Sequence, residues 1–182
     1  MDTEKLKSRY AAGERNFNGA NLHQANLSDA DLRGANLGGA DLSGANLSGA
    51  NLSGCDLSRS NMTDADLNGA DLQDANLSEV NFIGADLIKV NLERTNLTRA
   101  DLRSANLIRA NLVGANLSEA EMSGADLSEA NLNKANLIGS NLNEAEFNNT
   151  NLAGAIISEQ EITGSLMHVG LSHKWVTWAG GS

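Results

Sequence analysis

The chain repeats a five-residue pattern of apolar and polar positions along most of its length. Residues 45–57, ANLSGANLSGCDL, show a leucine at every fifth place, with Ala or Cys two places before it and Asn or Asp one place before it. An α-helix would spread such leucines around its axis, and a flat strand would send successive ones to opposite faces. Neither regular element can therefore bury all of them.

A chain that bends the same way in each phrase can keep every leucine inside. The central position runs from Phe17 to Ile162 through about thirty phrases without insertion or deletion. The centres that are not leucine are also large and apolar: Phe17, Met62, Phe82, Met122, Phe147, Ile157 and Ile162. Two places before the centre, from Ala20 to Ala155, only Ala, Cys, Ser, Thr or Val occurs. This predicts stacked coils with a leucine core and a second, narrow inward position, while the two places after the centre face water without a pattern.

The phrase A(D/N)LXX, in register over about residues 16–165, resembles the pentapeptide-repeat family. The resemblance implies an all-β solenoid, a right-handed quadrilateral β-helix in which four phrases form one coil of twenty residues, or about 7.5 coils here. The opening LKSRYAAGERNF, residues 6–17, resembles short cytoplasmic cyanobacterial members. We expect a cap helix in residues 1–15, the β-helix in residues 16–167 and a C-terminal cap or tail in residues 168–182.

Both ends depart from the phrase, as the ends of a solenoid must be covered. A helix that begins after Asp2 or Thr3 and stops at Gly13 would place Leu6 and Tyr10 on one face. The tail holds both tryptophans, Trp175 and Trp178. We expect them to cover the last coil, in preference to forming a dimer contact, and so expect a monomer.

The net charge of −10 is unevenly distributed. Residues 16–88 carry ten acids and two bases, which gives −8, whereas residues 89–109 carry five bases and two acids, which gives +3. Residues 110–182 return to −6, with eight acids and two bases. A basic belt therefore interrupts an acidic rod. Its members are Lys89, Arg94, Arg99, Arg103 and Arg109.

The belt has two interpretations. It can be a docking patch for a protein, formed with outward apolar residues, and the candidate residues are Ile88, Ile108, Lys89, Arg103 and Arg109. Alternatively, residues twenty apart stack in successive coils and form ladders of opposite charge. Such ladders would join Arg59, Glu79, Arg99 and Glu119, and would pair Asp74 with Arg94 and Arg109 with Glu129. We favour the ladders, in which Arg103 has no stacked partner.

No arrangement of residues indicates catalysis, a cofactor or a metal. The histidines are His23, His168 and His173, and no nucleotide-binding or nucleophile motif accompanies them. The calcium-loop opening at residues 64–69 lacks its glutamate, since Ala75 stands at the twelfth place. Cys55 occupies a narrow inward position, and we expect a buried, inert thiol.

The sequence thus favours a non-enzymatic scaffold or regulator that binds an unidentified protein partner. Because there is no long apolar run and no signal-peptide pattern, we expect a cytoplasmic protein with no membrane contact. We expect no direct nucleic-acid binding either. The alternative, which the family resemblance supplies, is a DNA mimic that modulates a type II topoisomerase such as gyrase, although the basic belt argues against a continuous negative surface.

Overall fold

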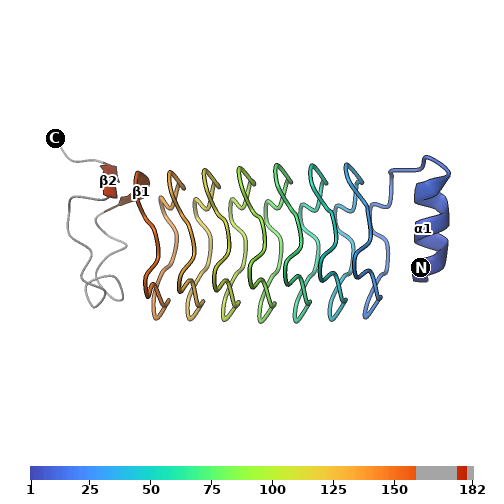
Figure 1. Cartoon of the computed structure of the whole chain (residues 1–182), viewed down its shortest axis with the longest axis horizontal. Helices are drawn as coiled ribbons and strands as arrows, with labels where there is room; N and C mark the ends of the chain where they lie inside the picture. The colour runs from blue at the N-terminus through green and yellow to red at the C-terminus, as the bar shows by residue number, and fades with distance from the viewer. Residues whose placement is uncertain (159–175, 180–182) are drawn as a thin grey trace.

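A computed structural model of the chain describes residues 1–158 and 176–179. Helix α1 (Thr3–Ala11) stands at one end, and strands β1 (Ala155–Ser158) and β2 (Val176–Ala179) lie together at the other. Between them the chain winds into a regular stack of coils, which gives an elongated rod (Figure 1). The pentapeptide phrase occupies this stack.

Each coil contains twenty residues, as the four-phrase interpretation requires. Parallel bridges join each residue before a centre to the residue twenty further on, from Asn16 with Asn36 to Asn136 with Ile156. The backbone hydrogen bonds between coils run in both directions: Leu22 N donates to Asp41 O at 2.7 Å, and Asp41 N donates to Ala20 O at 3.0 Å. Outside the two terminal strands, the contacts are single bridges and not extended strands, since each phrase turns again after its centre.

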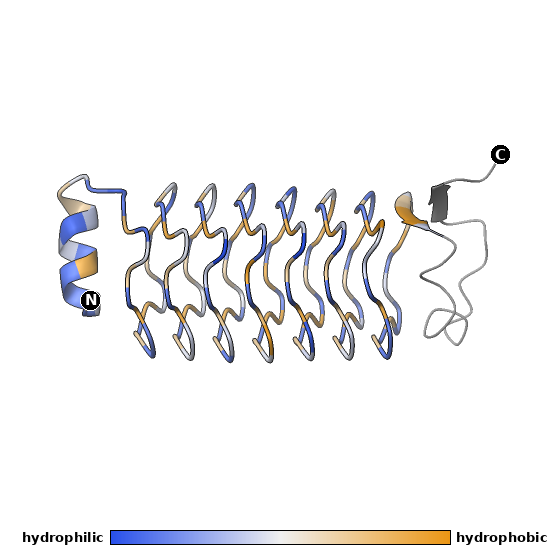
Figure 2. Cartoon of the chain, turned by 180° about the vertical axis from the view of Figure 1, so that it is seen from behind, coloured by the Kyte–Doolittle hydropathy of each residue, from blue (hydrophilic) through white to orange (hydrophobic). Residues whose placement is uncertain are grey.

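The predicted core is confirmed throughout the described coils. Every centre from Phe17 to Ile157 is at most 3% exposed, and the narrow positions from Ala30 to Ala145 are buried as well. Figure 2 shows hydrophobic positions recurring regularly along the coils. The twenty-residue coil also places Met62, Phe82 and Met122 in one column, as expected.

The second residue after each centre is not free of pattern, and the sequence expectation was wrong here. This residue has a positive φ angle in phrase after phrase, for example 65° at Gly54 and 56° at Arg59. Glycine adopts this left-handed conformation readily, whereas other residues do so at a cost. The frequency of glycine at this place is therefore a sequence signal of the corner conformation.

Helix α1 lies against the first coil. The Asp2 side chain accepts a hydrogen bond from Lys5 N at 2.7 Å and begins the helix, while Leu6 is fully buried. Tyr10 Oη donates to the carbonyl oxygen of Arg33 at 2.9 Å and so ties the helix to a coil.

At the other end, β1 and β2 pair in parallel, with Ile157 opposite Trp178 in the backbone register. Trp175, His168 and His173 lie outside the described residues, as does the expected boundary at residue 167. The number of coils and the covering role of the tryptophans accordingly stay predictions.

Candidate interaction surface

The phrase sends two kinds of side chain to the surface. Because the centre points inward, its two neighbours point outward, and the residue after them projects from the corner. The neighbour before the centre is bound within the rod: Asn51 Oδ1 accepts from Ser53 N at 3.1 Å, and Asn91 Nδ2 donates to Asp71 Oδ1 at 2.9 Å in the adjacent coil. The asparagine and aspartate columns therefore stabilise the turns and join the coils.

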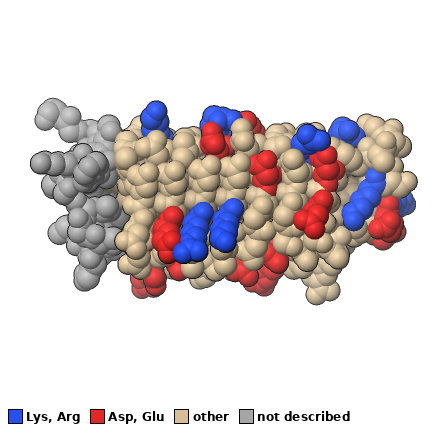
Figure 3. All heavy atoms as spheres, viewed as in Figure 1, with Lys and Arg blue, Asp and Glu red and all other residues tan. Residues whose placement is uncertain are grey.

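The corner positions carry stacked pairs of opposite charge, as the sequence predicted, although within residues 1–158 no ion pair joins Glu79 to Arg99, so the expected four-residue ladder forms as two separate pairs. Ion pairs across twenty residues join Arg99 Nε to Glu119 Oε2 at 2.7 Å and Arg94 Nε to Asp74 Oδ1 at 2.8 Å. The same spacing pairs Arg59 with Glu79 at 3.2 Å and Arg109 with Glu129 at 2.7 Å. On the face shown in Figure 3, basic and acidic side chains lie next to each other.

Pairing shifts the carboxyl groups toward their charged form. Hydrogen bonds from the guanidinium of Arg94 hold the pKa of Asp74 below its ordinary value, and Arg109 does the same to the pKa of Glu129. These groups are exposed to solvent, so each pair contributes little to the free energy of unfolding. Acidic residues of the rod nevertheless neutralise most of the belt's positive charge.

Arg103 has no stacked partner among the described residues, as expected, but it pairs with an acid in its own phrase. Its Nη2 lies 2.6 Å from Asp101 Oδ2 and its Nε lies 2.8 Å from Asp101 Oδ1, which gives a two-pronged ion pair within one phrase. Arg33 and Asp31 form the same pair near the N-terminal end. The signal was present in the sequence, since an acid and an arginine on either side of an inward centre must project on the same side.

The remaining candidates form a small surface that we call the isoleucine rung, which consists of Ile88, Ile108 and Lys89. Lys89 N donates to Ile108 O at 3.0 Å, so the two isoleucines lie one above the other on the same face of adjacent coils. Both side chains are half-buried. Within residues 1–158, the Lys89 ammonium forms no ion pair, and Arg109 beside it is bound to Glu129.

The structure brings together three residues whose types suggest catalysis. His23 Nδ1 lies 2.8 Å from Ser43 Oγ, and Ser43 Oγ donates to Asp41 Oδ1 at 2.6 Å. The serine hydroxyl thus donates its proton to the carboxylate and not to the imidazole. In a hydrolase the imidazole accepts the proton of the serine, so this order does not activate Ser43. The spacing of twenty residues between His23 and Ser43 would have revealed the contact.

Cys55 is buried, as expected. Its Sγ donates to the carbonyl oxygen of Leu32 at 3.0 Å, and burial raises the pKa of the thiol to about 11. Leu67, inside the calcium-like segment, is fully buried and belongs to the core. In the described part of the chain, no three acidic, histidine or cysteine residues gather as metal ligands would. No helix among the described residues is long and apolar enough to cross a bilayer.

Comparison with protein families gives a match along the whole stack of coils. The sequence matches the family model described as Pentapeptide repeats in eight overlapping copies, at residues 16–54, 25–64, 40–78, 60–99, 75–112, 95–133, 120–159 and 130–167. No curated protein sequence gives a significant match.

Solved structures of several repeat proteins are similar to the chain. A trypsin-treated form of QnrB1, a plasmid-mediated fluoroquinolone resistance protein, superposes with a TM-score of 0.71 at 22% identity, over 88% of this chain and 87% of QnrB1. HetL, a pentapeptide-repeat protein involved in heterocyst differentiation regulation from the cyanobacterium Nostoc sp. strain PCC 7120, is 33% identical over 87% of this chain and 82% of HetL, with a TM-score of 0.35. Rfr23 from the cyanobacterium Cyanothece 51142 is 25% identical over 97% of this chain and 100% of Rfr23, with a TM-score of 0.34.

Proposed function

The chain belongs to the pentapeptide-repeat family, and we propose that it is a non-enzymatic scaffold or regulator that binds a protein through the isoleucine rung. Members of this family are generally structural or interaction proteins with a right-handed quadrilateral β-helix. Such a rod presents long, regular faces while its interior is filled with leucine. Its surface is therefore the part available for function.

One observation supports this choice of surface above the rest of the belt. The arginines of the belt have acidic partners that fix them to the rod, whereas Lys89 has none within residues 1–158. Ile88 and Ile108 add a half-buried apolar pair beside this ammonium. A small apolar centre with an unpaired charge at its rim is typical of a protein contact.

The proposal also covers the protein's location, oligomeric state and kind of partner. We place it among the short cytoplasmic cyanobacterial members, on the resemblance of residues 6–17, as a monomer with a protein partner and without direct contact to nucleic acid or membrane.

Quantitative affinity capture from the cytoplasm of the source cell tests the proposal. The wild-type protein is compared with Ile108→Ser and with Val113→Ser, which alters an outward, half-buried aliphatic residue on a different face. We expect a protein that is retained by the wild type and Val113→Ser and lost by Ile108→Ser, while all three melt at similar temperatures. Equal capture by the three proteins would contradict the proposed surface.

A DNA mimic that acts on a topoisomerase is not favoured. Duplex DNA carries continuous negative charge, whereas paired arginines such as Arg94 and Arg99 interrupt the carboxylates of this rod. The likeness to QnrB1, at 22% identity, concerns the fold. A gyrase supercoiling assay separates the two functions: the scaffold predicts no effect of the added protein, and inhibition or protection of gyrase would favour the mimic.

A further inference from the structure

The first coil has an edge that helix α1 covers only in part. Throughout the rod, each coil donates to and accepts from the coil before it, as Asn51 N donates to Ala30 O at 2.9 Å. The first coil has no preceding coil, and the helix end supplies some of the missing partners. Tyr10 Oη donates to Arg33 O, and the N-terminal ammonium of Met1 donates to Asn21 O.

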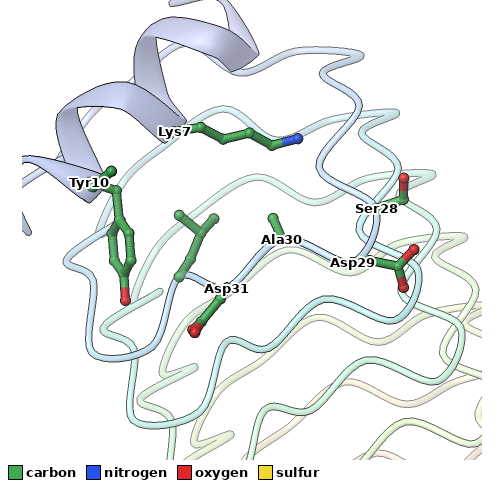
Figure 4. Close-up of a pocket in the computed structure, with 8 residues that line it drawn as sticks. Lys7, Tyr10, Ser28, Asp29, Ala30 and Asp31 are labelled. Atoms are coloured by element: carbon green, nitrogen blue, oxygen red, sulfur yellow. The ribbon is translucent and has the colours of Figure 1, made fainter.

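The rest of this edge has no partner among the residues that the structure describes. Within the described residues, the N–H and C=O groups of Asp31 and the C=O group of Ser28 form no backbone hydrogen bond toward the helix. A cavity of about 410 Å³ separates them from α1. Figure 4 shows it between Lys7 and Tyr10 on the helix and residues 28–31 on the coil. An open strand edge of this kind can pair with an added strand.

The lining of the cavity favours an aliphatic side chain. Ala11, Ala30 and Leu32 line it together with the ring of Tyr10. A rung added to the coil would send its own centre inward beside Ala30 and Leu32, because every coil in the rod does so. The cavity thus lies where the inward residue of an added rung would go.

The charge of Asp29, at a corner of this edge, indicates a second feature of the segment that would bind here. Asp29 lies against Gly49 of the following coil, where its Oδ1 takes the space that a Cβ on residue 49 would need. The following coil therefore offers no side chain to this carboxylate, and Asp29 has no ion pair among the described residues. Arg109 and Glu129 show one way in which the rod pairs such an acid, with a basic corner residue one coil earlier whose Nε lies 2.7 Å from Glu129 Oε2.

We propose that the edge from Ser28 to Leu32 binds an extended segment of a partner protein with the pattern basic–any–any–aliphatic. The segment adds a parallel rung, with its N–H groups donating to Ser28 O and Asp31 O and one of its carbonyls accepting from Asp31 N. Its aliphatic side chain fills the cavity, and its lysine or arginine pairs with Asp29. This site is separate from the isoleucine rung, and its test is independent of that proposal.

A fluorescently labelled peptide, NLIRANL, is a suitable probe because it copies residues 106–112, where Arg109 pairs with Glu129. Binding to the full chain is measured by polarisation. We expect Asp29→Lys to weaken binding by about tenfold or more, and a peptide with glutamate in place of the arginine to regain affinity for that variant. We expect Ala11→Trp, which fills the cavity from the exposed end of the helix, to abolish binding.

Asp64→Lys is the matched control, since Asp64 also lies against a glycine of the following coil, Gly84, but in the middle of the rod. It should bind the peptide as the wild type does. Hydrogen exchange gives a second readout, because the Asp31 amide should become protected when the peptide binds. No binding, equal binding by all the variants, or binding that leaves the Asp31 amide exchanging freely would overturn the proposal. Self-association of the chain that Ala11→Trp abolishes would also overturn it, because a second copy would then be the occupant.

Discussion

Arg99 and Glu119 are twenty residues apart in the chain, yet Nε of the arginine lies 2.7 Å from Oε2 of the glutamate. Glu79 stands in the same column one coil earlier, and its charge also raises the pKa of Arg99. The contact exists because the coil returns to the same corner after four phrases. Its consequence is that the sign of a corner residue must be judged against its neighbours twenty places away.

Truncating a centre in the middle of the rod should be strongly destabilising. Leu92 is fully buried between complete coils, and the ladders on either side prevent the coils from closing over a cavity. We expect Leu92→Ala to reduce the free energy of unfolding by about 2–5 kcal/mol in a urea titration. Ser53→Ala, which removes one hydroxyl hydrogen bond to Asn51, serves as the control and should cost about 1 kcal/mol or less. Similar losses in the two variants would mean that the centre is not tightly packed.

Enlarging the side chain at the narrow inward position should also be destabilising. Ala70 is 1% exposed, and its amide donates to Leu67 O at 3.0 Å within the same turn. Ala70→Leu adds three carbons where the coil has no room, so we expect a loss of about 1–3 kcal/mol or more. Thermal melting measures it. An unchanged melting temperature would show that this position can open toward solvent.

Much of this architecture could be predicted from the sequence, because one constraint, an inward leucine every fifth residue, applies in every phrase. The same constraint places Asp101 and Arg103 on either side of Leu102, so their ion pair follows from the spacing within a phrase, whereas stacking between coils gives Arg103 no partner. The corner conformation was also missed. It depends on the φ angle of one residue per phrase, and charged residues such as Arg59 adopt that angle in place of glycine.

The candidate site was less predictable than the fold. Stacking of Ile88 on Ile108 follows from the period of twenty, and so does the pair of Arg109 with Glu129. The open edge at Ser28 and Asp31 cannot be predicted from this period, because it depends on how far helix α1 extends over the first coil. The packing of a helix against an edge is set by a few side chains, here Leu6 and Tyr10, and no repeat fixes it.

Acid should remove the contribution of the Arg94–Asp74 pair. The arginine lowers the pKa of Asp74 below 3.8, its ordinary value, so the folded protein holds the proton less tightly than the unfolded chain does. The pair therefore stabilises the fold fully above that value, and the effect is lost as the pH falls through the lowered pKa. We expect the stability difference between the wild type and Arg94→Gln in urea to be small at about pH 7 and to vanish at about pH 2. A difference that stays constant across this range would contradict the assignment.

The thiol of Cys55 should not react in the folded protein. Burial raises its pKa to about 11, so at pH 8 only about one thiol in a thousand is ionised, and the core shields the sulfur as well. We expect a thiol reagent to label the protein in urea within seconds to minutes and the native protein only at the rate of unfolding. Rapid labelling of the native protein would mean that the coil around Cys55 opens readily.

The central claim is that the ladders serve the fold while the isoleucine rung binds the partner. The most direct measurement compares Arg99→Glu with Ile108→Ser, using melting at low and high salt together with capture of the partner. We expect Arg99→Glu, which places three acids in one column, to lower the melting temperature by a few degrees, less at high salt, and to keep the partner. Ile108→Ser should melt like the wild type and lose the partner. Loss of the partner in Arg99→Glu with unchanged melting, together with normal capture by Ile108→Ser, would contradict the account.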